Sequence, residues 1–128
     1  MTEENVKIVL EYNLITSIKL LFQRLSTPDG LSEWFAQKVI QHDKEFKFLW
    51  QESEANAEIA SMKHNEFIKF RWIDDNTDCF TEFKIVPQEM TGDVTLVITD
   101  CVNTEDKEDT LRMWENNVIK LKRALGFN

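Results

Sequence analysis

An apolar stripe near the end of the sequence constrains the fold more than any other feature. Its members recur at helical spacing and are Leu111, Trp114, Val118, Leu121 and Leu125. Acidic side chains gather before the stripe and basic ones near its end, as the helix dipole favours, and Gly126 provides a stop. A helix over Lys107–Leu125 would be about 30 Å long, enough to cross a sheet diagonally. We therefore expect one long helix packed against one sheet.

Most of the remaining chain shows the period of β-strands. From Asn5 to Tyr12, apolar side chains alternate with mainly polar ones, which indicates a half-buried strand. Between Lys38 and Val102, strand-like runs are separated by polar turns; the runs are KVIQ, EFKFLWQ, Ala55–Met62, FIKFRWI, CFTEFKIV and DVTLVITDCV, and the turns are HDK, HNE, DDNTD and PQEMTGD. The pattern predicts an antiparallel meander that brings the sheet to about six or seven strands.

Two short helices are expected between the first strand and the meander. Ile18, Leu21, Phe22 and Leu25 recur at helical spacing after a Thr16 or Ser17 cap. In the stretch TPDGLSEWF, Thr27 can cap a second helix and Pro28 suits its first position. Leu31, Trp34 and Phe35 then share one face of that helix. The two short helices together form an elbow after the first strand. Trp34 and Phe35 either fasten this elbow to the sheet or gate the mouth of a cavity.

This order of elements resembles the helix-grip fold of the START-like superfamily. The features that carry the resemblance are LLFQRLSTPDGLSEWF after the first strand and MWENNVIKLKRAL at the end. They are most similar to the carboxy-terminal domain of activators of the ninety-kilodalton heat-shock chaperone ATPase. The separate chaperone-binding domain of those activators has no counterpart here, so a co-chaperone role is not carried over. The resemblance implies a single START-like α+β domain over residues 1–128, with a curved antiparallel sheet wrapped around a long C-terminal helix.

In many relatives, the space between sheet and helix holds a lipid or another apolar molecule. The side chains expected to line that space here are Phe48, Trp50, Phe70, Trp72, Phe83, Trp114, Val118 and Leu121. These side chains are bulky, and each aromatic buries roughly 150–250 Å². The sequence therefore leaves two interpretations, an open ligand cavity or a core filled by the aromatics.

Composition excludes several partners. The formal net charge is -8, and no basic run offsets it locally, so we expect no nucleic-acid binding. No apolar run is long enough to span a membrane. Cys79 and Cys101 lack metal-ligand spacing, and we expect reduced thiols in a cytoplasmic protein, with a cross-strand disulfide as the alternative.

No catalytic or metal-binding motif is present, and we expect neither a cofactor nor a metal. His42 and His64 fall in turns, where they are expected to be solvated. Asp100 interrupts an apolar run; it either ends its strand facing water, the favoured interpretation, or is a semi-buried base or ligand anchor. Arg71 is expected to pair with an acidic neighbour, such as Glu82, across the outer sheet face.

Three functions follow from these observations. The first is a non-catalytic module that binds an apolar or amphipathic small molecule between the sheet and the terminal helix. The second is a protein-interaction scaffold with a filled core, either a homodimer or associated with a chaperone, for which Val9, Leu49 and Ile73 are candidate contacts on the outer face. The third is an enzyme of the cyclase or hydratase kind, which requires polar groups inside the cavity.

Overall fold

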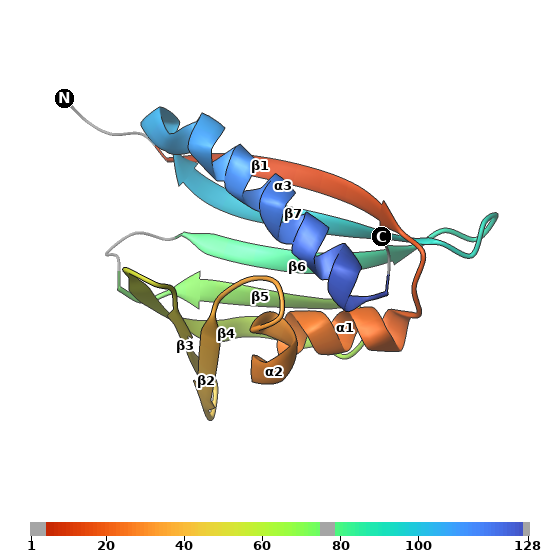
Figure 1. The fold of residues 1–128 in the computed structure, drawn as a ribbon, viewed down its shortest axis with the longest axis horizontal. Helices are drawn as coiled ribbons and strands as arrows, with labels where there is room; N and C mark the ends of the chain where they lie inside the picture. The colour runs from red at the N-terminus through yellow and green to blue at the C-terminus, as the bar shows by residue number, and fades with distance from the viewer. Residues whose placement is uncertain (1–4, 75–78, 127–128) are drawn as a thin grey trace.

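A computed structural model describes residues 5–74 and 79–126. Seven strands, three α-helices and one short 3-10 helix make up this part of the chain (Figure 1). In chain order the elements are β1 (Asn5–Leu14), α1 (Ile18–Ser26), α2 (Pro28–Leu31), β2 (Lys38–His42), β3 (Glu45–Leu49), β4 (Glu54–Lys63), β5 (Phe67–Trp72), β6 (Phe80–Pro87), β7 (Val94–Asn103), η1 (Thr104–Asp106) and α3 (Lys107–Ala124). The expected order of elements is confirmed; the turn expected at DDNTD lies mostly outside the described residues.

The strands form one unclosed antiparallel sheet in the order β1-β7-β6-β5-β4-β3-β2. Strands β2 to β7 form the predicted meander, and β1 adds to the far edge beside β7. All three α-helices lie on the same side of this sheet, where α3 crosses the strands diagonally and α1 and α2 pack beside it (Figure 1). The predicted helix-grip arrangement is confirmed.

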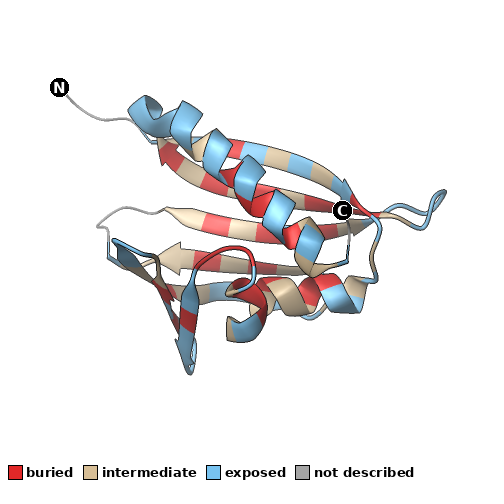
Figure 2. Ribbon diagram, in the orientation of Figure 1, coloured by how far each residue is buried: buried red, intermediate tan, exposed pale blue. Residues whose placement is uncertain are grey.

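Helix α3 buries one stripe of its surface and exposes the rest (Figure 2). The buried members are Trp114, Asn117, Val118 and Leu121, at the spacing of one helical face. Leu111 and Leu125 pack half-buried against the same core. The helix ends at Ala124, and Gly126 follows with a φ of 96°, a backbone conformation that glycine adopts without strain.

The elbow after β1 follows the predicted capping. The Ser17 side chain accepts a hydrogen bond of 3.1 Å from the Leu20 amide, and Thr27 Oγ1 accepts one of 3.0 Å from the Gly30 amide. Helix α2 is shorter than expected, because it ends at Leu31 and leaves Trp34 in the turns that follow. The predicted sharing of a helical face is therefore wrong, although the aromatic side chains still point inward.

Gly30 allows α2 to pack directly on α1. A Cβ atom at this position would lie 2.2 Å from the Gln23 carbonyl oxygen and 2.6 Å from Arg24 Cα. These distances are far below van der Waals contact, so only glycine fits without a backbone shift. The glycine of the TPDG stretch thus sets how closely the two helices approach.

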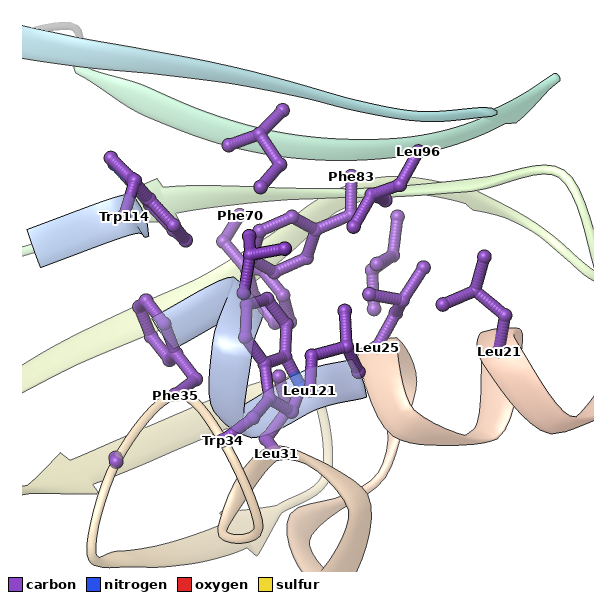
Figure 3. Packing of buried hydrophobic residues seen from close by; sticks show 14 of the residues in the cluster. Leu21, Leu25, Leu31, Trp34, Phe35, Phe70, Phe83, Leu96, Trp114 and Leu121 are labelled. Atoms are coloured by element: carbon purple, nitrogen blue, oxygen red, sulfur yellow. The ribbon is translucent and has the colours of Figure 1, made fainter. Parts of the chain in front are cut away.

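Trp34 and Phe35 fasten this elbow to the other layers. The Trp34 ring lies 5.3 Å from that of Phe83 on β6, and its indole nitrogen donates a hydrogen bond of 2.7 Å to the Arg24 carbonyl. The Phe35 ring stacks on Trp114 of α3 with centroids 5.5 Å apart. Figure 3 shows both side chains pointing into the space between the helices and the sheet.

Three details of the sheet differ from expectation. Arg71 bonds to Glu58, with Nε 2.8 Å from Oε1, because these residues face each other in the β4–β5 register, whereas Glu82 faces Lys69. Cys79 and Cys101 form a disulfide with Cα atoms 5.5 Å apart, since the chain entering β6 runs beside the end of β7; the expectation of free thiols is wrong.

The third detail concerns the outer face. Val9 lies on the edge strand β1, whereas Leu49 lies on β3 near the opposite edge, so they do not form one patch. Val9 is exposed, while Leu49 and Ile73 are only half-exposed. These residues therefore do not form the continuous outer surface that the interaction hypothesis requires.

Candidate functional site

A buried carboxylate joins the sheet to helix α3. Asp100 on β7 retains only 9% of its exposed surface. Its Oδ1 accepts hydrogen bonds from Thr81 Oγ1 at 2.7 Å and from the Cys101 amide at 2.8 Å. Its Oδ2 accepts one of 2.9 Å from the indole nitrogen of Trp114. The favoured expectation, a strand end facing water, is therefore wrong.

A second tryptophan extends this network. The indole nitrogen of Trp72 on β5 donates a hydrogen bond of 2.8 Å to Thr81 Oγ1, whose hydroxyl in turn donates to Asp100. A hydroxyl accepts one bond while donating another, so the bonds run in one direction from Trp72 to the carboxylate. The network connects β5, β6, β7 and α3 through polar atoms at the same end of the sheet.

The network lies in the wall of a pocket of about 680 Å³. Its walls are the ends of the strands and the first half of α3. The lining residues are Asn5, Phe35, Trp50, Glu54, Ala55, Trp72, Asp74, Cys79, Thr81, Asp100, Cys101, Asn103, Thr110, Met113 and Trp114. Its volume falls within the roughly 300–1,000 Å³ typical of small-molecule sites.

The predicted cavity residues divide into two groups. Trp50, Trp72 and Trp114 line the pocket. The others belong to the buried hydrophobic core, of which Figure 3 shows part, and are Phe48, Phe70, Phe83, Val118 and Leu121. The sheet and α3 thus enclose a core filled by aromatic and aliphatic side chains at their centre and a pocket at one end.

Aromatic packing holds the pocket walls. Trp50 donates a hydrogen bond of 2.9 Å from its indole nitrogen to the Phe35 carbonyl, and the two rings meet edge to face at 5.7 Å. Phe35 also stacks on Trp114, so one ring contacts both sides of the pocket. Such contacts limit the rotamers of these side chains and keep the pocket walls in place.

The sequence analysis favoured the solvent-facing alternative for Asp100 and did not consider Thr81, although the sequence contains a signal for both. Asp100 alternates in phase with the buried Leu96 and Ile98, and Thr81 alternates in phase with Phe83. A strand places every second side chain on one face, so both polar residues belong inside. The preference of aspartate for water outweighed this periodicity in the prediction.

The pocket carries negative charge. Asp74 accepts hydrogen bonds from the Asn56 amide at 2.5 Å and from Asn56 Nδ2 at 3.1 Å, and Glu54 Oε2 lies 3.1 Å from the Lys47 ammonium. The donors that hold Asp100 are all neutral. Lysine and arginine are absent from the described residues that line the pocket.

A second hollow of about 850 Å³ adjoins the first. The two share Phe35, Trp50 and Met113, so these side chains stand between them. The second hollow continues along α3 past Asn117 to Lys120. A ligand longer than the first pocket therefore has room on the far side of Trp50.

The histidines lie outside the pocket. His42 is exposed beside Asp43 at the β2–β3 turn, and His64 contacts the Phe22 ring edge to face at 5.4 Å. Within residues 5–74 and 79–126, the histidine, cysteine, aspartate and glutamate side chains form no group of three with the geometry of a metal site. In the same part of the chain, every helix is too short or too polar to cross a bilayer.

The unclosed sheet, the diagonal helix and the pocket between them define a helix-grip protein. The chain belongs to the START-like superfamily, whose domain model matches residues 1–127. A search of curated proteins found no match.

Solved structures share this fold. BfR322 from Bacteroides fragilis is 38% identical, with a TM-score of 0.66, over 100% of this chain and 95% of its own. The Aha1 dimer from Colwellia psychrerythraea is 17% identical, with a TM-score of 0.79, over 94% of this chain and 96% of its own. DynU16, from the dynemicin biosynthetic locus, is 12% identical, with a TM-score of 0.78, over 93% of this chain and 46% of its own. The last two likenesses concern the fold alone.

Proposed function

We propose that this protein is a non-catalytic binding module for an apolar or amphipathic small molecule, held in the pocket between the strand ends and α3. The observation that carries the proposal is the lining: the Phe35, Trp50, Trp72 and Trp114 rings surround a pocket that also presents hydrogen-bonding groups. Ligand sites typically combine apolar walls with a few placed polar groups. START-like proteins commonly bind ligands in this region, which supports the same conclusion.

A neutral fluorescent probe tests this proposal. N-phenyl-naphthylamine brightens in apolar surroundings, and we expect saturable, micromolar binding to the full chain. Ala55→Phe places a ring in the pocket and is expected to weaken binding at least about tenfold, since a filled site loses its apolar contacts. Ala60→Phe on the same strand is the matched control, because Ala60 is exposed and is not among the pocket's lining residues. Equal binding by the two variants would contradict the proposal.

A homodimeric interaction scaffold is the second candidate. It is supported by the likeness to the Colwellia Aha1 dimer and by two apolar side chains near the start of α1, Ile15 at 71% and Leu20 at 52% exposure. Light scattering on the purified chain decides it: a dimer that Ile15→Asp and Leu20→Asp dissociate supports the scaffold. A monomer at high micromolar concentration rejects it.

An enzyme is the third candidate. Asp100 in the pocket and the likeness to DynU16 support it. A general base needs a lone pair directed at its substrate, and hydrogen bonds from Thr81, Trp114 and a backbone amide already engage Asp100. We therefore place catalysis behind binding.

A further inference from the structure

The charges around the pocket point to the class of ligand. We propose, on the basis of the proposed binding function, that the ligand is an organic cation: an apolar molecule that carries an amine or quaternary ammonium group. The inference combines three features of the pocket: two carboxylates, Asp74 and Asp100, whose hydrogen-bond donors are neutral, aromatic faces beside them, and the absence of lysine and arginine from the described lining residues.

Neutral groups donate the hydrogen bonds that hold Asp100 and Asp74 in the pocket wall. Asp100 is held by a hydroxyl, an indole and a backbone amide, and Asp74 by the amide groups of Asn56. These donors satisfy hydrogen bonds without supplying positive charge. Among the described lining carboxylates, only Glu54 has a basic partner in the described part of the chain; this partner is Lys47, and both side chains are about half-exposed. The pocket therefore favours a positive ligand and disfavours an anion such as a fatty acid or a phosphate.

The aromatic rings are suited to the same ligand. Trp72 and Trp114 donate their indole N–H groups to Thr81 and Asp100, which fixes both rings next to the carboxylate. Tryptophan attracts cations to its ring face more strongly than other aromatics, and protein sites for quaternary ammonium groups use such rings. The pocket thus offers both an ionic and a cation–π partner within one wall.

A neighbouring hollow can hold the apolar part of the ligand. The hollow beyond Phe35, Trp50 and Met113 adjoins the pocket and shares these three lining side chains with it. A hydrocarbon tail can extend past them along α3 while the cationic head stays near Asp74 and Asp100. An amphipathic cation fits this arrangement better than a small hydrophilic amine does.

Three amphiphiles with the same alkyl chain test the inference: decyltrimethylammonium, decanol and decyl sulfate. Each is titrated below its micelle concentration by calorimetry against the full chain. We expect the ammonium to bind about tenfold more tightly than decanol, and the sulfate to bind most weakly, because ion-pair and cation–π contributions add in a partly buried site. Raising the salt concentration should reduce the difference.

A pair of double variants assigns the charge effect to the pocket. Glu54→Gln with Asp74→Asn removes two charges from the lining, and we expect the preference for ammonium over decanol to fall at least about threefold. Glu89→Gln with Asp93→Asn removes the same charge from the β6–β7 loop, which lies outside the pocket lining, and should leave the preference unchanged.

The outcomes separate the two proposals. Equal binding of ammonium and decanol, or tighter binding of the sulfate, overturns the cation inference and leaves the binding function standing. If the preference for ammonium over decanol falls equally in both double variants, the inference is also overturned, because the protein's net charge rather than the pocket then causes the preference. Failure of all three amphiphiles and of N-phenyl-naphthylamine to bind overturns the binding function and the cation inference together.

Discussion

The indole nitrogen of Trp114 lies 2.9 Å from Asp100 Oδ2, so one hydrogen bond ties the first half of α3 to β7. Both side chains are buried at the wall of the pocket. This contact holds the helix over the sheet at the end where the filled core borders the pocket.

Removing the indole donor should destabilise the protein without changing its fold. Trp114→Phe keeps an aromatic ring but leaves Oδ2 of Asp100 without its donor, and we expect a loss of about 1–3 kcal/mol in the free energy of unfolding, measured with urea. Ile119→Ala, at a half-exposed position of the same helix, should change it by less than about 1 kcal/mol. Equal effects of the two variants would show that the hydrogen bond contributes nothing specific.

The close approach of α1 and α2 predicts a strong effect at one glycine. Gly30→Ala forces a methyl group against the backbone of Gln23, and we expect a loss of about 1–3 kcal/mol or more, with a lowered melting temperature. Gly92→Ala is the control, because its Cβ would meet no atom within 4 Å and only its φ of 75° opposes the change. That control should lose about 1 kcal/mol. A larger loss at Gly92 would contradict this account of the helix contact.

Substitution of a core aromatic should mainly lower stability, whereas substitution of a pocket aromatic should mainly weaken ligand binding. Phe83→Ala removes a fully buried ring and is expected to cost about 3–5 kcal/mol of stability. Trp50→Leu removes a half-buried pocket ring and should weaken N-phenyl-naphthylamine binding more than it lowers stability. Urea unfolding and probe titration on both variants check this. A Trp50 variant with normal binding would place the ligand elsewhere.

The disulfide predicts a redox-dependent stability. The bond between Cys79 and Cys101 spans 22 residues of sequence, and closing a loop of that size stabilises a protein by about 3 kcal/mol. We expect dithiothreitol to lower the urea midpoint of the oxidised protein accordingly. A Cys79→Ser/Cys101→Ser variant should be insensitive to dithiothreitol. The same response in that variant would assign the effect to something other than the bond.

Tyr12 predicts an alkaline limit to stability. Burial, and then the nearby Glu115 carboxylate, raise the pKa of Tyr12 above its ordinary value of 10.0. The folded state therefore keeps the phenol proton where the unfolded state has lost it, so this contribution is complete below pH 10.0 and is lost as pH rises through the folded pKa. Tyr12→Phe should flatten the fall in stability above pH 10.0, measured by urea unfolding. An unchanged slope would contradict this assignment.

The sequence predicts the architecture well because its signals are local. Helix α3 shows its buried face through the spacing of Trp114, Val118 and Leu121, and the strands show theirs through alternation. Caps such as Ser17 and Thr27 act on amides only a few residues away. Periodicity and helix caps involve residues close together in the sequence, so both can be recognised without knowing the tertiary structure.

The chemistry of the pocket was harder to predict because its contacts are distant in sequence. Asp100 depends on Trp114 and Thr81, which come from a different helix and strand, so its own neighbours suggest a solvent-exposed residue. Arg71 pairs with Glu58 rather than with Glu82 because the register decides which carboxylate it faces. Such partners are known only once the strands are paired.

The position of β1 also bears on synthesis. Its partner is β7, with Leu14 opposite Val94 and Asn5 opposite Asn103, so this strand leaves the ribosome long before its partner exists. A nascent chain therefore carries an unpaired strand edge while the rest is translated, and closing so long a loop slows folding. During that interval the apolar face of β1 stays exposed, which is the condition that favours aggregation during folding.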